Sequence, residues 1–390
     1  MTGFLLPLIV TLAVQIQASL VVFTPPVLAP VAEIDVGVRA SAVGIVTALI
    51  YGASIPAALL AGHVLERVGA IRVSQFCLLL TSAGMALIAV PSAWVIALGA
   101  LVAGLGYGTV TPASSTVLAE RVPPGWRVFL FSLKQTGVPV GGAIAGALVP
   151  VAIDLFGWQA AALGVALLGL VVAAAAQTVQ RAVDSEIPPR RSAHGTGLVE
   201  PLRLVFSHAR LRELALSSFA YSGMQMCLGS YLVVSLMERT GFSVTAAGAA
   251  LSAAMIAGAI GRLFWGAIAD NWVSSRRLLG LLGLAMSGAA FLTAAIGAAW
   301  PPPAIYALAF FFGASAVGWN GVYLAEVARI APPGRAGAAT GASLAMTYSG
   351  VMVLPSLFWL IHAATDSYAA AFVSVGALTL WRGAAFLRGR

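Results

Sequence analysis

Two stretches of the chain share one pattern: GHVLERVGAIR at residues 62–72 and GAIADNWVSSR at residues 266–276. In each stretch a glycine precedes an acidic residue by four positions and an arginine by ten. A second pair, LAE at residues 118–120 and LAE at residues 324–326, follows in the same order and leads in both cases to a Pro-Pro-Gly and an arginine. Two matches in one order predict an internal duplication of two like-ordered halves.

The composition indicates the medium in which these halves fold. Of 390 residues, 60% are hydrophobic and 9% are charged, whereas soluble globular proteins carry roughly 25% charged residues. This excludes a soluble enzyme and predicts an all-α protein in a lipid bilayer, since about 20 apolar helical residues cross a ~30 Å hydrocarbon core. Twelve such runs lie at residues 4–28, 40–61, 72–90, 94–117, 128–151, 158–179, 211–236, 243–268, 277–299, 303–327, 336–361 and 367–387.

The basic residues predict the orientation of these spans. If the N-terminus is cytoplasmic, 17 of the 21 Lys and Arg residues fall in inner loops or the C-terminal tail, Arg382 among them. Only Arg39 and Arg239 fall in outer loops. Because basic residues collect in cytoplasmic loops, the net charge of +8 indicates topology rather than nucleic-acid binding. The chain is therefore expected in a cell inner membrane, with both termini cytoplasmic.

A polar segment divides the predicted spans into two sets of six. Residues 181–210 are the longest polar stretch and are expected to be a cytoplasmic linker between six-helix bundles at residues 1–180 and 211–390. Its end, residues 198–212, alternates apolar and basic residues, which is compatible with a short interfacial helix.

The repeated pattern at residues 62–72 and 266–276 resembles the signature of the major facilitator superfamily of transporters. The resemblance covers the whole chain and implies two six-helix halves related by a pseudo-two-fold axis, which rock around a central site in alternating access. It implies a cytoplasmic charge network that latches the outward-open state, and two glycines that allow close helix contact. The motif and gating residues are Gly62, Glu66, Arg67, Arg72, Gly266, Asp270, Arg276, Glu120, Glu326, Arg127 and Arg335. The alternative is that these loop charges are merely solvated.

Two cations are predicted to lie within spans. Lys134 is the only lysine, and Arg262 lies eight residues before Asp270, about 12 Å from the cytoplasmic end of its helix. Their counterparts in the other half are Ser343 and Ala58, so neither charge belongs to the duplicated scaffold. All thirteen acidic residues are expected at loops or span ends. Embedded charges are costly and usually functional, so these two cations predict a small organic anion as substrate, most simply a carboxylate.

A narrower resemblance supports this prediction. GRLFWG at residues 261–266 is similar to a helix-8 motif of the oxalate/formate and monocarboxylate transporters, in which the arginine binds the substrate carboxylate. Residues 134–139, KQTGVP, are similar to bacterial members of the cyanate-permease-like kind. Many proton-linked relatives carry an Asp where this chain has Gly258, which favours exchange or uniport over proton symport. The alternatives are that Arg262 contacts a helix-end carbonyl or Asp270, and that Lys134 snorkels to the interface.

Further polar and aromatic residues at useful depth complete the predicted substrate site: Gln15, Gln17, Tyr107, Gln225, Tyr231, Trp319, Asn320 and Tyr348. Gln15 and Gln17 face different ways, so one of them is expected to line the cavity. Gln225 and Asn320 are the stronger pair, because buried amides need partners. Each residue alone is equally compatible with helix–helix contact.

Other function classes fit the sequence less well. Proton-coupled export of amphipathic drugs or metabolites is the main alternative, but it predicts an embedded acidic residue. A transporter-like sensor would need a signalling domain, and an enzyme would need converging His, Cys or acidic residues at membrane depth. The sequence thus predicts a monomeric carrier with no cofactor and no metal, whose partners are the bilayer, the anion, and a proton or counter-anion.

Overall fold

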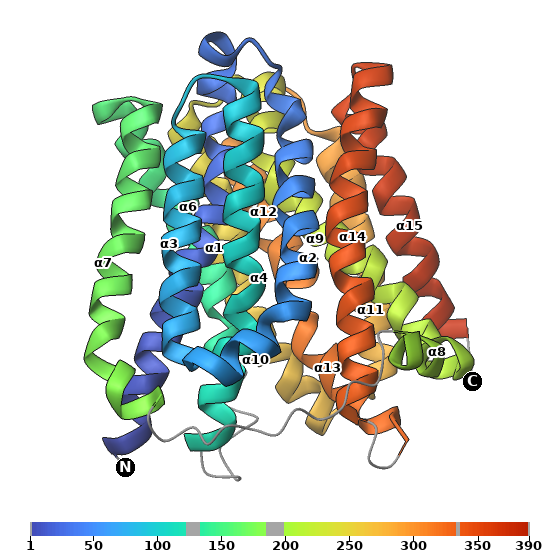
Figure 1. Cartoon of the computed structure of the whole chain (residues 1–390). Coiled ribbons are helices and arrows are strands. Elements are labelled where there is room, and N and C mark those ends of the chain that lie inside the picture. The colour runs from blue at the N-terminus through green and yellow to red at the C-terminus, as the bar shows by residue number, and fades with distance from the viewer. Residues whose placement is uncertain (1, 122–132, 185–198, 333–335, 389–390) are drawn as a thin grey trace. The chain divides into compact units, whose positions relative to one another are not determined.

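A computed structural model describes the chain except for residues 1, 122–132, 185–198, 333–335 and 389–390 (Figure 1). The described residues are almost entirely α-helical, and eleven helices are long and apolar enough to cross a membrane. A further long helix, α9, has charged ends and several polar residues along its length. The predicted all-α membrane fold is confirmed. The chain divides into two compact units, Met1–Ala193 and His194–Arg390, which are described one at a time.

The described residues of the first unit form six long helices and a short 3-10 helix (Figure 1). They are α1 (Thr2–Val36), η1 (Ala40–Ala42), α2 (Val43–Val68), α3 (Ala70–Ile88), α4 (Ala93–Arg121), α6 (Gly137–Phe156) and α7 (Trp158–Asp184). The helix α4 packs between α2 and α3, while α1 packs on α6 and α3 packs on α7. Close packing depends on small residues: a Cβ on Gly104 or Gly108 would collide with carbonyl oxygens of α2.

The junction between α2 and α3 lies inside the first repeated motif. Gly69 has φ 87° and ψ 160°, a conformation essentially restricted to glycine. The carboxylate of Asp184, at the end of α7, accepts hydrogen bonds from the backbone N–H of Ile71 (2.9 Å) and of Arg72 (3.1 Å). It thereby caps the N-terminus of α3. A Cβ on Gly69 would lie 2.6 Å from the Cβ of Asp184, so this glycine also leaves the space that the cap occupies.

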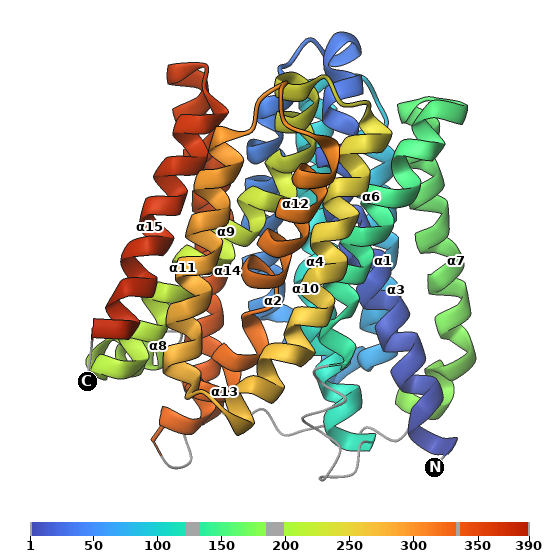
Figure 2. The ribbon, with the colours of Figure 1, turned by 180° about the vertical axis from the view of Figure 1, so that it is seen from behind.

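Eight helices are described in the second unit and are seen from behind in Figure 2. They are α8 (Val199–Ser207), α9 (Ala209–Thr240), α10 (Val244–Asn271), α11 (Ser275–Ala295), α12 (Pro302–Ala316), α13 (Asn320–Ile330), α14 (Ala336–Thr365) and α15 (Tyr368–Arg388). The main packing pairs are α11 with α15, α9 with α14, and α10 with α12. The helix α8 lies where a short helix was expected, and its place at a membrane surface stays a prediction.

The tenth predicted span differs from its expected form. Residues 303–327 were expected to be one helix, but α12 ends at Ala316 and α13 begins at Asn320, with a turn at residues 317–319 between them. A Cβ on Gly318 would lie 2.7 Å from the ring of Trp265 on α10, so the glycine lets the turn approach that helix. The break therefore brings the backbone of this span close to α10.

Candidate functional site

The first predicted cation, Lys134, is buried within the first unit. It lies in a short helical turn just before α6, and its side chain is 1% exposed. Its ammonium donates to the Oε1 of Gln135 (3.3 Å) and is close enough to the Cys77 thiol on α3 to interact with it electrostatically. This burial does not fit a side chain that snorkels to water.

The two glutamines of α1 turn toward different helices, as their spacing predicts. Gln17 donates through Nε2 to the carbonyl of Val165 on α7 (2.8 Å), which is a helix–helix contact. Gln15 packs against Gly137, one turn after Lys134, and donates to the Oγ of Ser19 (3.3 Å). Its Oε1 is buried and accepts no hydrogen bond among the described residues. Gln15 is therefore the better candidate for a ligand contact.

The second predicted cation, Arg262, lies on α10 beside the break between α12 and α13. Its side chain is 8% exposed, and its Nε donates to the carbonyl of Val317 (3.2 Å), in the turn that follows α12. The contact with a helix-end carbonyl, considered from the sequence as an alternative role, is thus present. A Cβ on Gly258, one turn earlier on α10, would lie 2.5 Å from a methyl group of Val317. No carboxylate side chain fits at position 258.

The residues that follow the break form a polar and aromatic group in the second unit. The Nδ2 of Asn320, the first residue of α13, donates to the Oε1 of Gln225 on α9 (3.3 Å), so this predicted amide pair meets. Trp319 is fully buried between the rings of Tyr221 (5.6 Å) and Tyr323 (5.1 Å). Its indole Nε1 donates to no acceptor among the described residues. The break thus places the buried N–H donor of Trp319 directly before Asn320, whose amide meets that of Gln225.

The remaining predicted aromatic residues differ in their surroundings. The hydroxyl of Tyr231 donates to the carbonyl of Pro355 (2.7 Å), and its ring stacks on Phe358, so it joins α9 to α14. Tyr107 is half-buried on α4, with its ring edge-on to Tyr51 of α2. Tyr348 is half-buried on α14. Tyr231 therefore supports helix packing rather than a ligand.

A third cation is buried in the second unit, which corrects the sequence analysis. Arg382 was counted with the cytoplasmic charges, although the predicted span at residues 367–387 includes it; it lies within α15 and is only 7% exposed. Its Nε donates to the Oγ of Ser217 (3.2 Å) and its Nη2 to the carbonyl of Glu213 (3.1 Å). The Glu213 carboxylate pairs with Arg276 (3.0 Å). Arg382 thus lies beside an ion pair.

The motif residues are only partly described. Arg67 is exposed, and Arg72 donates to the side-chain oxygens of Gln75 and Gln177 (both 3.2 Å). Arg276 bonds to Glu213 on α9 and to the carbonyl of Phe386 on α15. The surroundings of six motif residues lie outside the described residues: Gly62, Glu66, Glu120, Arg127, Asp270 and Arg335.

Two further motif residues show different local packing. Glu326 is buried and accepts two hydrogen bonds from Arg329 (2.6 and 2.8 Å). These bonds raise the pKa of the Arg329 guanidinium above its usual value. Among the residues that the structure describes, a Cβ on Gly266 would meet no heavy atom within 4 Å. The close helix contact that the family resemblance implies at Gly266 is therefore not seen in this structure.

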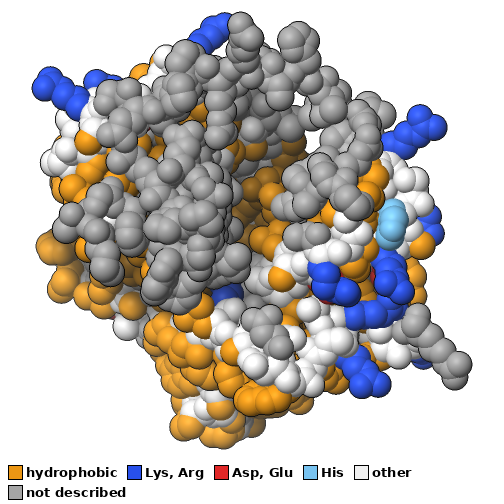
Figure 3. Space-filling model, turned by 90° about the horizontal axis from the view of Figure 1, so that it is seen from below, with side chains coloured by type: hydrophobic (Ala, Val, Ile, Leu, Met, Phe, Trp, Pro, Cys, Tyr) orange, Lys and Arg blue, Asp and Glu red, His pale blue; other side chains and the backbone are white. Residues whose placement is uncertain are grey.

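The charged surface and the metal-binding potential of the described chain are limited. Figure 3 shows several basic and few acidic side chains on the face viewed from below, where grey atoms cover much of the surface. Among the described residues, no three His, Cys, Asp or Glu side chains gather as a metal site would require. Cys77 and Cys227 are buried and unbridged.

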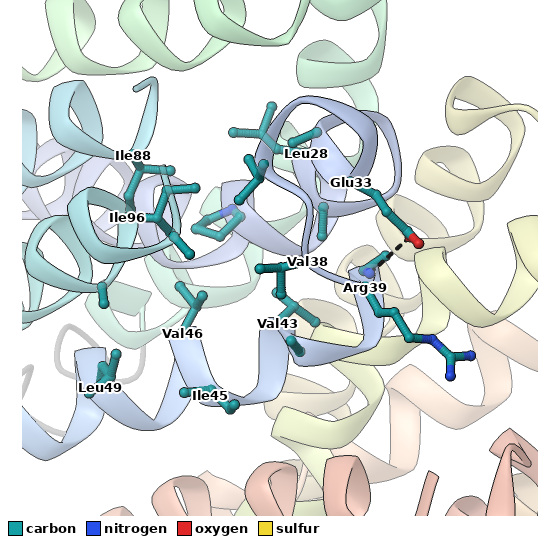
Figure 4. A pocket seen from close by; sticks show the side chains of 18 of the residues that line it. Leu28, Glu33, Val38, Arg39, Val43, Ile45, Val46, Leu49, Ile88 and Ile96 are labelled. Carbon is teal, nitrogen blue, oxygen red and sulfur yellow. Dashed lines mark hydrogen bonds between the residues drawn. The ribbon is translucent and has the colours of Figure 1, made fainter. Parts of the chain in front are cut away.

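The first unit also contains an apolar cavity that sequence reasoning missed. It has a volume of about 210 Å³ and lies between α1, η1, α2 and α4, with Trp158 of α7 also in its wall. Figure 4 shows the side chains that line it. None of the predicted substrate residues belongs to this lining. Its lining comes from three stretches of the chain, within residues 25–49, residues 88–97 and Trp158, so no local sequence pattern could have indicated it.

Comparisons of sequence agree with this architecture. Residues 8–355 match the profile of the Major Facilitator Superfamily. The chain is 24% identical over 310 residues to a gentisate transporter of Corynebacterium glutamicum, an alignment that covers 74% of this chain and only 66% of that transporter. It is 21% identical over 314 residues to a hexuronate transporter of Bacillus subtilis, covering 73% of this chain and 70% of the relative.

Solved structures have the same fold. A peptide transporter in complex with sulfate superposes with a TM-score of 0.77 at 16% identity, covering 98% of this chain and 93% of that one. A bacterial homologue of the human lysosomal transporter Spinster, inward-facing and unoccupied, gives a TM-score of 0.75 at 16% identity, covering 98% and 96%. At these identities the likeness concerns the fold alone.

Proposed function

The chain belongs to the Major Facilitator Superfamily, and from this premise we propose that it carries a small organic anion, most simply a carboxylate, by alternating access. The observation that carries the proposal is the burial of Lys134 in the first unit and of Arg262 in the second. Buried cations are costly and usually functional within a membrane. We place the carrier in a cell inner membrane as a monomer, with both termini cytoplasmic.

The two cations have different roles in this proposal. Val317 accepts from the Nε of Arg262 and so orients the guanidinium, whose two terminal nitrogens form the fork that suits a carboxylate. Lys134 supplies a point charge, and Gln15 on the neighbouring helix supplies a polar contact. The amide pair of Gln225 and Asn320 provides hydrogen bonds for further polar groups of the substrate.

The names of the similar proteins support a substrate that carries both a carboxylate and hydroxyl groups. Their names specify gentisate and a hexuronate, and both of these compounds carry a carboxylate and hydroxyl groups. Such compounds would use a charged contact for the carboxylate and amide contacts for the hydroxyls. The aromatic rings around Trp319 add an apolar surface near the amide pair.

We further propose that transport is exchange or uniport. Gly258 is buried against Val317, so a proton-binding carboxylate does not fit one turn before Arg262. Counterflow in vesicles, with and without a pH gradient, tests this directly. Uptake that depends strictly on the gradient would contradict it and would favour proton coupling.

The binding site is tested by ligand-induced stabilisation of the purified protein. Gentisate or glucuronate at about 100 times Kd should stabilise the wild type by about 2.7 kcal/mol. Lys134→Met and Arg262→Met should each reduce this stabilisation, because each removes a charge that binds the anion. Arg382→Met is the matched control, since it also removes a buried cation but should retain the ligand effect. If both carboxylates stabilise all three variants as much as the wild type, the proposed site is wrong.

A further inference from the structure

The cavity of the first unit has an apolar part and a polar end. Its apolar wall includes Leu28, Val43, Val46, Leu49, Ile88 and Ile96. The charged residues of its lining are Glu33 at the end of α1 and Arg39 just before η1. Figure 4 shows both at the same end of the cavity, with the Arg39 guanidinium directed away from the apolar side chains. The lining is therefore amphipathic, with both signs of charge at one end.

The acidic group at this end is held in place by the backbone. The Oε2 of Glu33 accepts a hydrogen bond from the N–H of Ala40 (2.9 Å), which closes the connection between α1 and α2. The other nearby acid, Asp35, accepts from the indole Nε1 of Trp158 (2.7 Å) and from Gln159 (3.3 Å). Glu33 is thus the acidic side chain of the cavity lining, and its Oε1 can accept from a bound cation.

The cavity lies where membrane helices end. The connection between α1 and α2 and the start of α4 both contribute to it, and these three helices are candidate membrane spans. Beside it, Ile34 is 91% exposed and Trp94 is 87% exposed. Tryptophan is enriched at the interface between bilayer and water. The polar end therefore lies at headgroup depth, and the apolar wall extends toward the depth of the acyl chains.

We propose that this cavity binds a phospholipid whose zwitterionic headgroup carries a primary ammonium. An acyl chain packs on the apolar wall, the guanidinium of Arg39 binds the phosphate, and the carboxylate of Glu33 accepts from the ammonium. A primary ammonium donates hydrogen bonds, which a quaternary choline group cannot do, and a phosphatidylglycerol headgroup has no cation for Glu33. The lining thus favours phosphatidylethanolamine over phosphatidylcholine and phosphatidylglycerol. This site is separate from the proposed substrate site, and its test does not depend on transport.

Native mass spectrometry of the purified full chain tests the proposal, with phosphatidylethanolamine, phosphatidylcholine and phosphatidylglycerol offered at equal mole fractions. The wild type should retain phosphatidylethanolamine most strongly. Glu33→Gln keeps an acceptor for the N–H of Ala40, and it should weaken phosphatidylethanolamine binding about tenfold while leaving phosphatidylglycerol binding unchanged. Asp154→Asn is its matched control, because it removes an exposed acidic charge elsewhere and should change nothing.

Arg39 is tested by a charge-removing and a charge-keeping variant. Arg39→Gln should weaken all three lipids, since each has a phosphate, whereas Arg39→Lys should retain most binding. Arg388→Gln, which removes an exposed arginine outside the cavity, should bind lipids as the wild type does. Equal retention of the three lipids by the wild type would overturn the proposal. So would unchanged phosphatidylethanolamine binding in Glu33→Gln or Arg39→Gln.

Discussion

Replacing Gly69 by alanine should destabilise the first unit through two separate effects. Its backbone conformation, φ 87° and ψ 160°, costs a residue with a Cβ about 1–3 kcal/mol. The new Cβ would also displace the Asp184 side chain and so remove the cap of α3, which is worth about 0.5–2 kcal/mol. We expect Gly69→Ala to lower the free energy of unfolding by about 1.5–5 kcal/mol in total.

Gly157 offers a matched control within the same unit. It has nearly the same conformation, φ 84° and ψ 162°, but a Cβ there would meet only the Oε1 of Gln159 at 3.8 Å. Gly157→Ala should therefore show the backbone cost without the loss of the cap. The difference between the two variants should be about 0.5–2 kcal/mol, measured as free energies of unfolding in detergent–SDS mixed micelles.

A double-mutant cycle makes this reasoning refutable. In an Asp184→Ala background the cap is already absent, so Gly69→Ala should cost no more than Gly157→Ala does in the wild type. Two results would refute the argument. One is an equal cost for the two glycine variants, and the other is a cost of Gly69→Ala that Asp184→Ala leaves unchanged.

Three further predictions concern the second unit. Arg382→Gln should lower the unfolding free energy by about 1.5–3 kcal/mol, because α15 loses its hydrogen bonds to α9; an unchanged unfolding midpoint would contradict this. Gln225→Leu and Asn320→Leu should each cost about 0.5–1.5 kcal/mol by removing the hydrogen bond between these two half-buried amides, and thermal melts should show the double variant costing less than the sum. Gly258→Ala should destabilise by about 1–3 kcal/mol through overpacking, whereas Gly288→Ala, which has open space, should be neutral or stabilising.

Hydropathy and repeat patterns predicted the helices because the membrane leaves few options. An apolar run of bilayer length must satisfy its own backbone groups, and a helix does so within one segment. Hydropathy did not predict the break in the tenth span, because the turn that contains Gly318 lies within an otherwise apolar run. The turn there forms against α10, where Arg262 donates to Val317. This contact joins distant segments and leaves no periodic signal in the sequence.

Candidate site residues could be predicted from the sequence only where the side chain carries a charge, because burying a charge in lipid is costly. Lys134 and Arg262 stood out because a charge in an apolar run is rare, and both side chains are buried. Arg382 was missed because it lies near the cytoplasmic end of its predicted span and was counted among the basic residues that indicate topology. The groups that accept its hydrogen bonds, Ser217 and the carbonyl of Glu213, lie on α9, far from it in sequence.

The division of span ten has a consequence for how the chain enters the membrane during synthesis. The helix α12 has 15 residues and is about 22 Å long, which is too short to cross a ~30 Å hydrocarbon core. The insertion machinery therefore must accept Pro302–Val327 as one apolar segment, including the polar Asn320. We expect the turn at residues 317–319 to form against α10, whose Arg262 donates to the carbonyl of Val317, after the segment has entered the membrane.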